Sequence, residues 1–247
     1  MAKLSLSPIL TQIAKEWDEI GPVRHELISR GEDLSFDGIL TPYITKTLRN
    51  ISPSTVLDVG CGTGDLSLKI ASSGIQTRAI DISPKSLAIA CSENMHPLLI
   101  YTNEPIDNFS LNDLDPFDMC VANMVLMDTP DVDRVLLAVR SALKARGVLC
   151  LTIFHPIFYT FSFSKPFRGD YRSEVRLIET FRTTLYRGAQ LFRSHWHRPI
   201  EMYVRKLIRA GFRIVSLDEL GPPKSLRSLY GDAGRFPRFL GIVARSE

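Results

Sequence analysis

The sequence predicts a buried strand that leads directly into a helix through a tight turn near residue 60, and this arrangement limits the folds that the chain can adopt. The segment from Thr55 to Leu66 reads T-V-L-D-V-G-C-G-T-G-D-L. Its first half is a short apolar run typical of a parallel strand, and apolar residues then recur at helical spacing from Leu66. The turn between them holds Gly60, Gly62 and Gly64. Because glycine has no Cβ, such a turn lets a ligand approach the main chain, and it predicts a nucleotide-sized groove.

The glycine spacing indicates which ligand the groove holds. A dinucleotide fingerprint needs G-x-G-x-x-G, and a P-loop needs a lysine after its glycines; this chain has G-x-G-x-G and no lysine in the turn. Asp58 stands two residues before Gly60. Its carboxylate would repel a pyrophosphate but attract an amino or sulfonium group. The ligand should therefore be cationic on that side, which argues against an NAD-dependent oxidoreductase.

A second acidic residue, Asp81, ends the next predicted strand, and Pro84 opens the helix after it. In a doubly wound sheet, a carboxylate at this place can accept hydrogen bonds from both hydroxyls of a ribose. The three segments V-L-D-V-G-C-G-T-G, A-I-D-I-S-P and D-P-F-D-M-C-V-A-N-M-V-L follow one another in order. Together they resemble the class I S-adenosylmethionine-dependent methyltransferases, from about residue 37 to the end of the chain.

The resemblance implies S-adenosylmethionine as cofactor and S-adenosylhomocysteine as product. It also implies that Asp58 lies near the methionine amino group, that the three glycines back the methionine portion, and that Asp81 binds the ribose. Ile82 would lie against the adenine ring, and Asn103 or its neighbour Glu104 would bind the adenine amino group. The glycines are Gly60, Gly62 and Gly64; Asn123 would lie beside the reactive methyl, with Met124 to Met127 as a floor.

The alternation of strands and helices predicts a single α/β domain over residues 1–247, with a doubly wound, mostly parallel seven-stranded sheet. We expect an N-terminal helical cap (1–50), a cofactor-binding core (51–154), a substrate lid after the fifth strand (155–198), and a C-terminal helix with edge strands (199–247). In the cap, Gly21-Pro22 should end the first helix. The final strand, 239–244, is expected to lie antiparallel at the edge of the sheet.

The lid should cover the methyl acceptor, because ligands of open α/β sheets bind outside the carboxyl ends of the strands. Its alternating residues from Val175 to Trp196 predict a hairpin, and its many aromatics would offer an apolar wall. Candidate substrate contacts are Tyr43, Phe158, Tyr159 and Trp196. Trp17 and Phe36 in the cap could also touch the cofactor or substrate, although an aromatic at helical spacing more often belongs to the core. The basic residues of this region could attract an acidic small molecule or a nucleic acid, but no RNA-binding motif appears, which argues against nucleic acid.

Methyl transfer from a sulfonium is an in-line displacement, and some acceptors must also lose a proton to a base. His155, directly after the fifth predicted strand, is the first candidate for this base, and His197 with its neighbour His195 is the second. The segments F-H-P-I-F and H-R-P-I-E-M-Y-V resemble small-molecule methyltransferases of secondary metabolism. We therefore expect methylation of an oxygen or nitrogen of a small molecule, as part of natural-product biosynthesis.

Other classes stay open at this point: an RNA or protein methyltransferase, and a binding module without transferase activity. Residues 122–125 lack the aromatic that follows an N/D-P-P-type motif, which argues against methylation of a flipped base. The sequence has no membrane-length apolar run and no signal-like start, so a cytoplasmic location without membrane contact is expected. Its four cysteines form no C-x-x-C pair, and we expect no metal site. A homodimer is compatible with the sequence.

Overall fold

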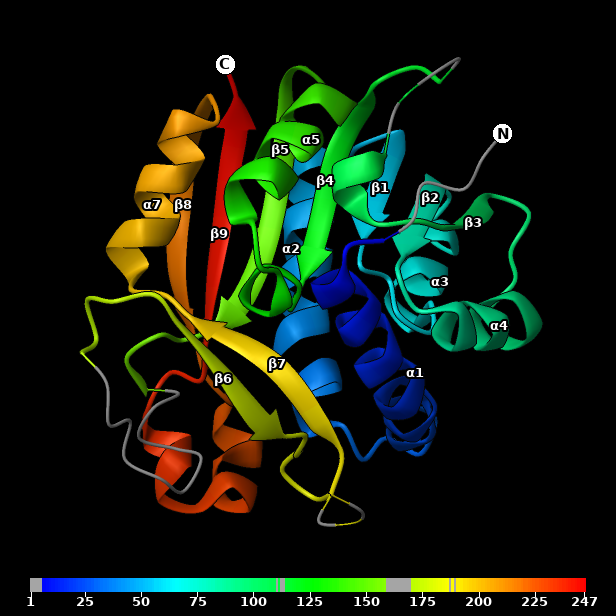
Figure 1. The fold of residues 1–247 in the computed structure, drawn as a ribbon. Helices are drawn as coiled ribbons and strands as arrows, with labels where there is room; N and C mark the ends of the chain where they lie inside the picture. The colour runs from blue at the N-terminus through cyan, green and yellow to red at the C-terminus, as the bar shows by residue number, and fades with distance from the viewer. Residues whose placement is uncertain (1–5, 110, 112–113, 159–169, 187, 189) are drawn as a thin grey trace.

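The computed structural model describes residues 6–109, 111, 114–158, 170–186, 188 and 190–247. Its centre is a seven-stranded sheet in the order β3-β2-β1-β4-β5-β9-β8 (Figure 1). The strands are β1 (Thr55–Val59), β2 (Gln76–Asp81), β3 (Leu99–Asn103), β4 (Phe117–Asn123), β5 (Leu143–Phe154), β8 (Phe212–Leu220) and β9 (Phe239–Ser246). Strands β1 to β5 pair in parallel, whereas β9 runs antiparallel to both of its neighbours. The predicted doubly wound, mostly parallel sheet is confirmed.

The prediction that the final strand lies at the edge was wrong. Strand β9 lies between β5 and β8, and β8 is the edge strand. The physical reason is visible in the burial of each strand. Nearly every residue of β9 is buried, as an interior strand requires, whereas β8 alternates and exposes Val215 and Leu217.

Helices cover both faces of the sheet, and two hydrophobic clusters fill the space beneath them. Successive residues of a strand enter opposite clusters: Val56 and Met119 face one side, Leu57 and Cys120 the other. The α-helices on the sheet are α2 (Thr41–Ile51), α3 (Asp65–Ala71), α4 (Pro84–Glu93), α5 (Val132–Ala142) and α7 (Ile200–Arg209). The chain also forms a π-helix, η1 (Phe36–Leu40), and the 3-10 segments η2 (Ile106–Asn108), η3 (Leu126–Asp128) and η4 (Lys224–Arg235). Among the described helices, none is long and apolar enough to cross a membrane.

Helix α1 (Pro8–Ser29) continues through Gly21-Pro22, so the predicted stop at this pair was wrong. Proline removes one hydrogen bond from a helix but does not always end it. Here Gly21 lies against α4, and a Cβ at this position would come within 2.2 Å of Ser86 Oγ. The close contact that glycine allows holds both halves of α1 on the same neighbour.

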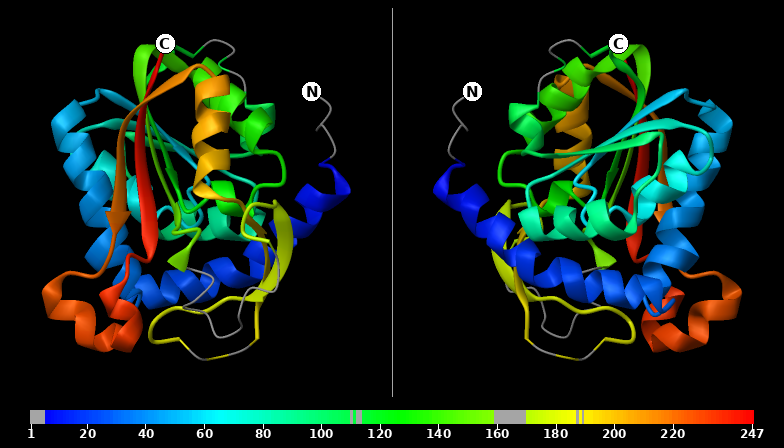
Figure 2. Two further views of the ribbon diagram at one scale, coloured as in Figure 1. Left: turned by 90° about the vertical axis from the view of Figure 1, so that its left-hand side faces the viewer. Right: turned by 90° about the vertical axis from the view of Figure 1, so that its right-hand side faces the viewer.

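Three elements gather at the carboxyl ends of the parallel strands. Figure 2 shows α1, η4 and the hairpin of β6 (Val175–Thr180) and β7 (Phe192–His197) at this end of the sheet. The predicted hairpin is present, with β6 and β7 paired antiparallel. Glu16 of α1 accepts hydrogen bonds from the amide and the hydroxyl of Ser194 at 2.6 and 2.9 Å, which joins the N-terminal helix to the hairpin.

Candidate active site

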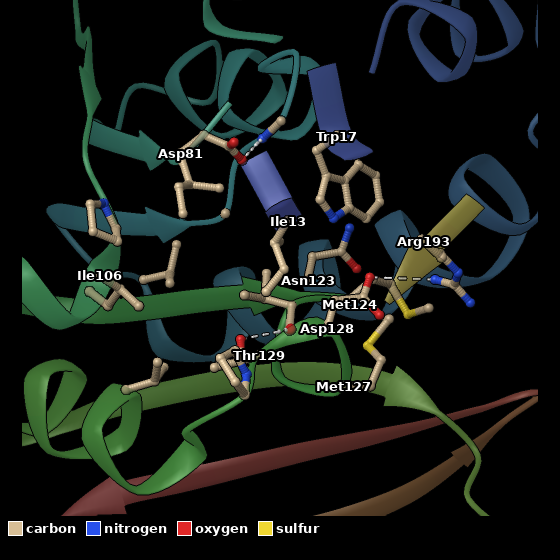
Figure 3. Close-up of a pocket in the computed structure, with 18 of the residues that line it drawn as sticks. Ile13, Trp17, Asp81, Ile106, Asn123, Met124, Met127, Asp128, Thr129 and Arg193 are labelled. Atoms are coloured by element: carbon tan, nitrogen blue, oxygen red, sulfur yellow. Dashed lines mark hydrogen bonds and ion pairs between the residues drawn. The ribbon is translucent and has the colours of Figure 1, made fainter. Parts of the chain in front are cut away.

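A cavity of about 690 Å³ lies where the carboxyl ends of the strands meet α1 and the hairpin (Figure 3). One side of it is formed by the glycine turn and the ends of β2 and β3. The other side is lined mainly by apolar and aromatic residues of α1, of the loop after β4, and of the ends of β5 and β9. These include Ile13, Trp17, Met124, Met127, Phe154 and Phe239, and Phe181, which follows β6, also lines the cavity.

The glycine turn is held open by Asp81. Both Gly60 and Gly62 line the cavity with positive φ, of 69° and 57°. The carboxylate of Asp81 accepts hydrogen bonds from the amides of Gly62 at 2.7 Å and Ser83 at 2.8 Å. Burial raises the pKa of Asp81, and these amides oppose that shift. Asp81 and its neighbour Ile82 also line the cavity, so the predicted ribose and adenine contacts lie together.

Asp58 is a buried carboxyl group with one unsatisfied oxygen. Ser67 Oγ donates to its Oδ2 at 2.5 Å, whereas Oδ1 has no hydrogen-bond partner among the described residues. Burial raises the pKa of Asp58 to about 7, although the Ser67 hydrogen bond opposes the shift. A small second cavity, which Asp58 lines together with Arg24 and Asn123, adjoins the glycine turn. An ammonium group placed there would satisfy the free oxygen, so these residues fit the amino-acid portion of S-adenosylmethionine.

Arg24 was not predicted from the sequence. It lies on α1, lines both cavities, and its Nε lies 3.5 Å from Asp33 Oδ2. Its guanidinium stands beside the site that fits the amino-acid portion of the cofactor, where it could bind a carboxylate. No local motif marks Arg24, because only the packing of α1 brings it to the glycine turn.

Two of the predicted cofactor residues support the site from outside the cavity wall. Gly64 has φ of 81°, and a Cβ there would come within 2.2 Å of the Tyr101 hydroxyl. Asn103 is exposed, and its side-chain amide donates to the carbonyl of Asp81 at 3.0 Å. Its neighbour Glu104 does line the cavity, and burial raises its pKa. The acidic residue of this pair is therefore the one placed to meet a ligand.

The end of β4 carries a backbone conformation that is rare for a residue with a side chain. Met124 has φ of 63°, and its amide donates to the carbonyl of Thr152 at 2.9 Å. Thr152 Oγ1 in turn donates to Asn123 Oδ1 at 2.7 Å. This contact fixes the orientation of the Asn123 amide, which lines the cavity between its two sides. Positive φ outside glycine is concentrated at functional sites, which agrees with this placement.

Three of the four predicted substrate contacts, Tyr43, Phe158 and Trp196, are not among the residues that line the cavity. Tyr43 donates to Asp218 at 3.0 Å and fills the space above Gly241. Phe158 stacks on Phe236 with a centroid distance of 5.4 Å. Trp196 is buried in the hairpin, with the guanidinium carbons of Arg176 and Arg198 at 5.4 and 6.0 Å from its ring centroid. Tyr159 lies outside the described residues. The aromatics that do line the cavity, such as Trp17 and Phe239, come from other elements.

The predicted histidine bases are also absent from the residues that line the cavity. His155 is fully buried; its Nδ1 accepts from the amide of Ile157 at 3.3 Å, and its Nε2 lies 3.2 Å from Glu219 Oε1. His197 Nε2 lies 2.9 Å from the carbonyl of Tyr171. Burial lowers the pKa of both histidines. The geometry therefore places both groups in internal hydrogen bonds, and a catalytic role for either stays a prediction.

Comparison with known proteins agrees with this geometry. Residues 57–149 match the methyltransferase domain family. The chain is 24% identical to N-demethylindolmycin N-methyltransferase of Streptomyces griseus over 88% of this chain and 91% of that protein. Its fold matches a crystal structure of an S-adenosylmethionine-dependent methyltransferase from Mesorhizobium loti (TM-score 0.60, 24% identity, 81% of this chain and 96% of that one).

A further match is a 1,6-didemethyltoxoflavin-N1-methyltransferase of Burkholderia thailandensis, solved with 1,6-didemethyltoxoflavin and S-adenosylhomocysteine (TM-score 0.59, 16% identity, 100% of this chain and 93% of that one). The family match covers the strand, glycine turn and second acidic residue described above. The chain is a class I S-adenosylmethionine-dependent methyltransferase.

Proposed function

We propose that this enzyme transfers the methyl group of S-adenosylmethionine to a nitrogen or oxygen of a compact small molecule in natural-product biosynthesis. The observation that carries the proposal is that one cavity joins the cofactor residues to an apolar chamber. Gly62 and Asp81 line it at one end, and Met127, Phe154 and Phe239 line it at the other. A donor and an acceptor bound in such a cavity would lie next to each other, as a direct transfer requires.

The size of the cavity favours a small acceptor. Its volume of about 690 Å³ must hold both the cofactor and the acceptor. A site of this order normally encloses one or two small molecules. The remaining space suits a compact ring system, and it favours a small molecule over an RNA or a protein side chain.

The names of two relatives support nitrogen as the accepting atom. The Streptomyces protein is named as an N-methyltransferase of N-demethylindolmycin, and the Burkholderia protein as an N1-methyltransferase of 1,6-didemethyltoxoflavin. Both names describe methylation of a small molecule. The same kind of reaction here would use the aromatic chamber to hold a planar acceptor, because aromatic side chains pack well against planar rings.

Bound S-adenosylmethionine supplies a methyl group on a positively charged sulfur, and the C–S bond breaks as the new C–N or C–O bond forms, the electron pair staying on sulfur. Asp58 would bind the amino group, Arg24 the carboxylate and Asp81 the ribose hydroxyls. Asn123 and Met124 would border the reacting atoms, and the aromatic wall would exclude water. A neutral amine can attack through its lone pair and lose its proton afterwards, so such an acceptor needs no base in the cavity.

Calorimetric titration with S-adenosylmethionine, S-adenosylhomocysteine and NADH tests the cofactor half of the proposal. The first two should bind and NADH should not. A screen of compact aromatic amines, phenols and heteroaromatic compounds, read by formation of S-adenosylhomocysteine, then tests the acceptor. Binding of the cofactor without methylation of any small molecule, or methylation confined to RNA or protein, would refute the acceptor assignment.

A further inference from the structure

The loop between β4 and α5 forms the floor of the cavity. Residues 124, 125 and 127–130 of this loop all line the cavity. The loop is irregular: it contains the short turn η3 and the positive φ of Met124. Because regular secondary structure does not satisfy its backbone, several of its carbonyl groups must find donors elsewhere.

One buried guanidinium supplies these donors. Arg198 donates from Nη1 to the carbonyl of Leu126 at 2.9 Å, and from Nη2 to the carbonyls of Thr129 at 2.7 Å and Pro130 at 3.2 Å. Its Nε donates to Glu174 Oε1 at 2.9 Å, which also balances its charge. The side chain of Arg198 is 0% exposed. Burying a cation costs much free energy unless its donors are paired, so the pairing fixes the loop and the guanidinium in one arrangement.

The hairpin reaches the same loop at a second place. Arg193 Nη1 lies 3.4 Å from Asp128 Oδ2, and His195 Nδ1 lies 3.5 Å from Asp128 Oδ1. Both residues belong to β7, and alternate residues of a strand face the same side. Figure 3 shows the pair of Arg193 and Asp128 beside Met124 and Met127 in the cavity wall. The loop is thus bound to the hairpin along its length.

The hairpin and the residues that follow β6 also line the cavity themselves, through Phe181, Thr183 and Arg193. Arg198 itself is not among the residues that line the cavity. Its contacts therefore hold the floor of the cavity in a fixed place relative to the residues of the hairpin region that line the same cavity. In a displacement reaction, a misplacement of about 1 Å can cost roughly 10²-fold in rate.

We propose that Arg198 is a positioning residue for methyl transfer: it sets the distance between donor and acceptor without touching either. This rests on the proposed function. The variant Arg198→Lys keeps a positive charge near Glu174 but replaces the planar guanidinium by a single ammonium group, which cannot reach all three carbonyls. We expect it to fold and to bind S-adenosylhomocysteine within about threefold of wild type, and to lose about 10²-fold in kcat.

Two further variants are compared with Arg198→Lys. Arg205→Lys makes the same exchange on the exposed side of α7, where the side chain is 64% exposed, and kcat should not change. Glu174→Gln removes the balancing charge but keeps the Arg198 guanidinium on the three carbonyls. It should lower kcat by more than Arg205→Lys and by less than Arg198→Lys. If Arg198→Lys does not fold, Glu174→Gln alone tests the positioning role of Arg198, and an unchanged kcat in Glu174→Gln overturns the proposal.

Hydrogen exchange provides a readout that needs no acceptor. With S-adenosylhomocysteine bound, amides of residues 124–131 should exchange faster in Arg198→Lys than in wild type, while β1 and β2 keep their protection. Unchanged exchange, unchanged kcat, or equal losses of kcat and cofactor affinity would each overturn the proposal. Failure of the wild-type protein to bind S-adenosylhomocysteine would instead refute the proposed function, so the two failures can be told apart.

Discussion

His25 Nδ1 lies 3.0 Å from Asp65 Oδ1, although 40 residues separate the two in the chain. Its other nitrogen, Nε2, lies 3.0 Å from Glu93 Oε2. One imidazole on α1 thus bridges α3, which begins directly after the glycine turn, and α4. Burial acts to lower the pKa of His25, but the hydrogen bonds and charges of Glu93 and Asp65 outweigh it, and the pKa is raised.

The bridge should make stability depend on pH. Because the folded pKa is raised above the unfolded one, the stabilisation is fully present below about pH 6.5 and is lost as the pH rises through the folded pKa. The variant His25→Gln should therefore be less stable than wild type at pH 6, by no more than about 1 kcal/mol, since Glu93 is largely exposed. Urea unfolding at pH 6 and pH 8.5 measures this. An equal difference between the proteins at both pH values would contradict it.

Asp81 should dominate cofactor affinity. The variant Asp81→Asn keeps the size of the side chain but removes the charge that accepts hydrogen bonds from the turn amides and from a ribose. We expect S-adenosylhomocysteine to bind roughly 10- to 100-fold more weakly, as for loss of charge-assisted hydrogen bonds. Calorimetry measures this, and Asn103→Ala serves as the neighbouring control, with a smaller effect. Unchanged affinity in Asp81→Asn would show that the ribose lies elsewhere.

Cofactor binding should be coupled to the proton on Asp58. With its pKa at about 7, the carboxyl group is partly protonated near neutral pH in the free protein. An ammonium group bound beside it would favour the charged form and lower its pKa. Affinity for S-adenosylmethionine should therefore rise as the pH is raised from 6 toward 7.5, with release of a proton on binding. Calorimetry in buffers of different ionisation enthalpy measures the proton, and Asp58→Asn should abolish its release.

His155 could act as a structural group or as the general base predicted from the sequence, and a substitution distinguishes the two roles. Its two nitrogens already face Ile157 and Glu219, so we expect His155→Gln to lower the midpoint of thermal unfolding while turnover of the folded enzyme falls by less than about tenfold. Turnover normalised to folded protein measures this. A fall of roughly 10² to 10⁴ with stability unchanged would instead support the role of base predicted from the sequence.

The cofactor side of the site was largely predictable because it is encoded locally. Gly60, Gly62, Asp81 and Ile82 lie within two strand–turn–helix segments, and a strand fixes where its last residue points. The acceptor side was not predictable in the same way. Trp17 stood as a candidate with the core as its alternative, because helical spacing does not say which face of α1 will meet a ligand, and Arg24 was missed altogether; both come to the cavity because α1 lies across the ends of the strands.

The same limit explains why Tyr43 and Trp196 are absent from the residues that line the cavity, and why the final strand was wrongly placed at the edge. Tyr43 and Trp196 satisfy the pattern of a ligand contact, but the space that each fills, above Gly241 or between two arginines, depends on partners far away in the chain. Pairing of β9 with both β5 and β8 is likewise a choice among long-range neighbours, which alternation within one strand does not determine.

The place of β9 also constrains the order of assembly. Strand β8 precedes β9 in the chain, yet its partner in the sheet is β9. Until β9 has been synthesised, β8 has no edge to join, and its exposed Val215 and Leu217 belong to an unpaired segment. If the parallel strands pair before β9 is available, β5 is the edge strand of that incomplete sheet. This is the stage at which association between chains would compete most strongly with folding.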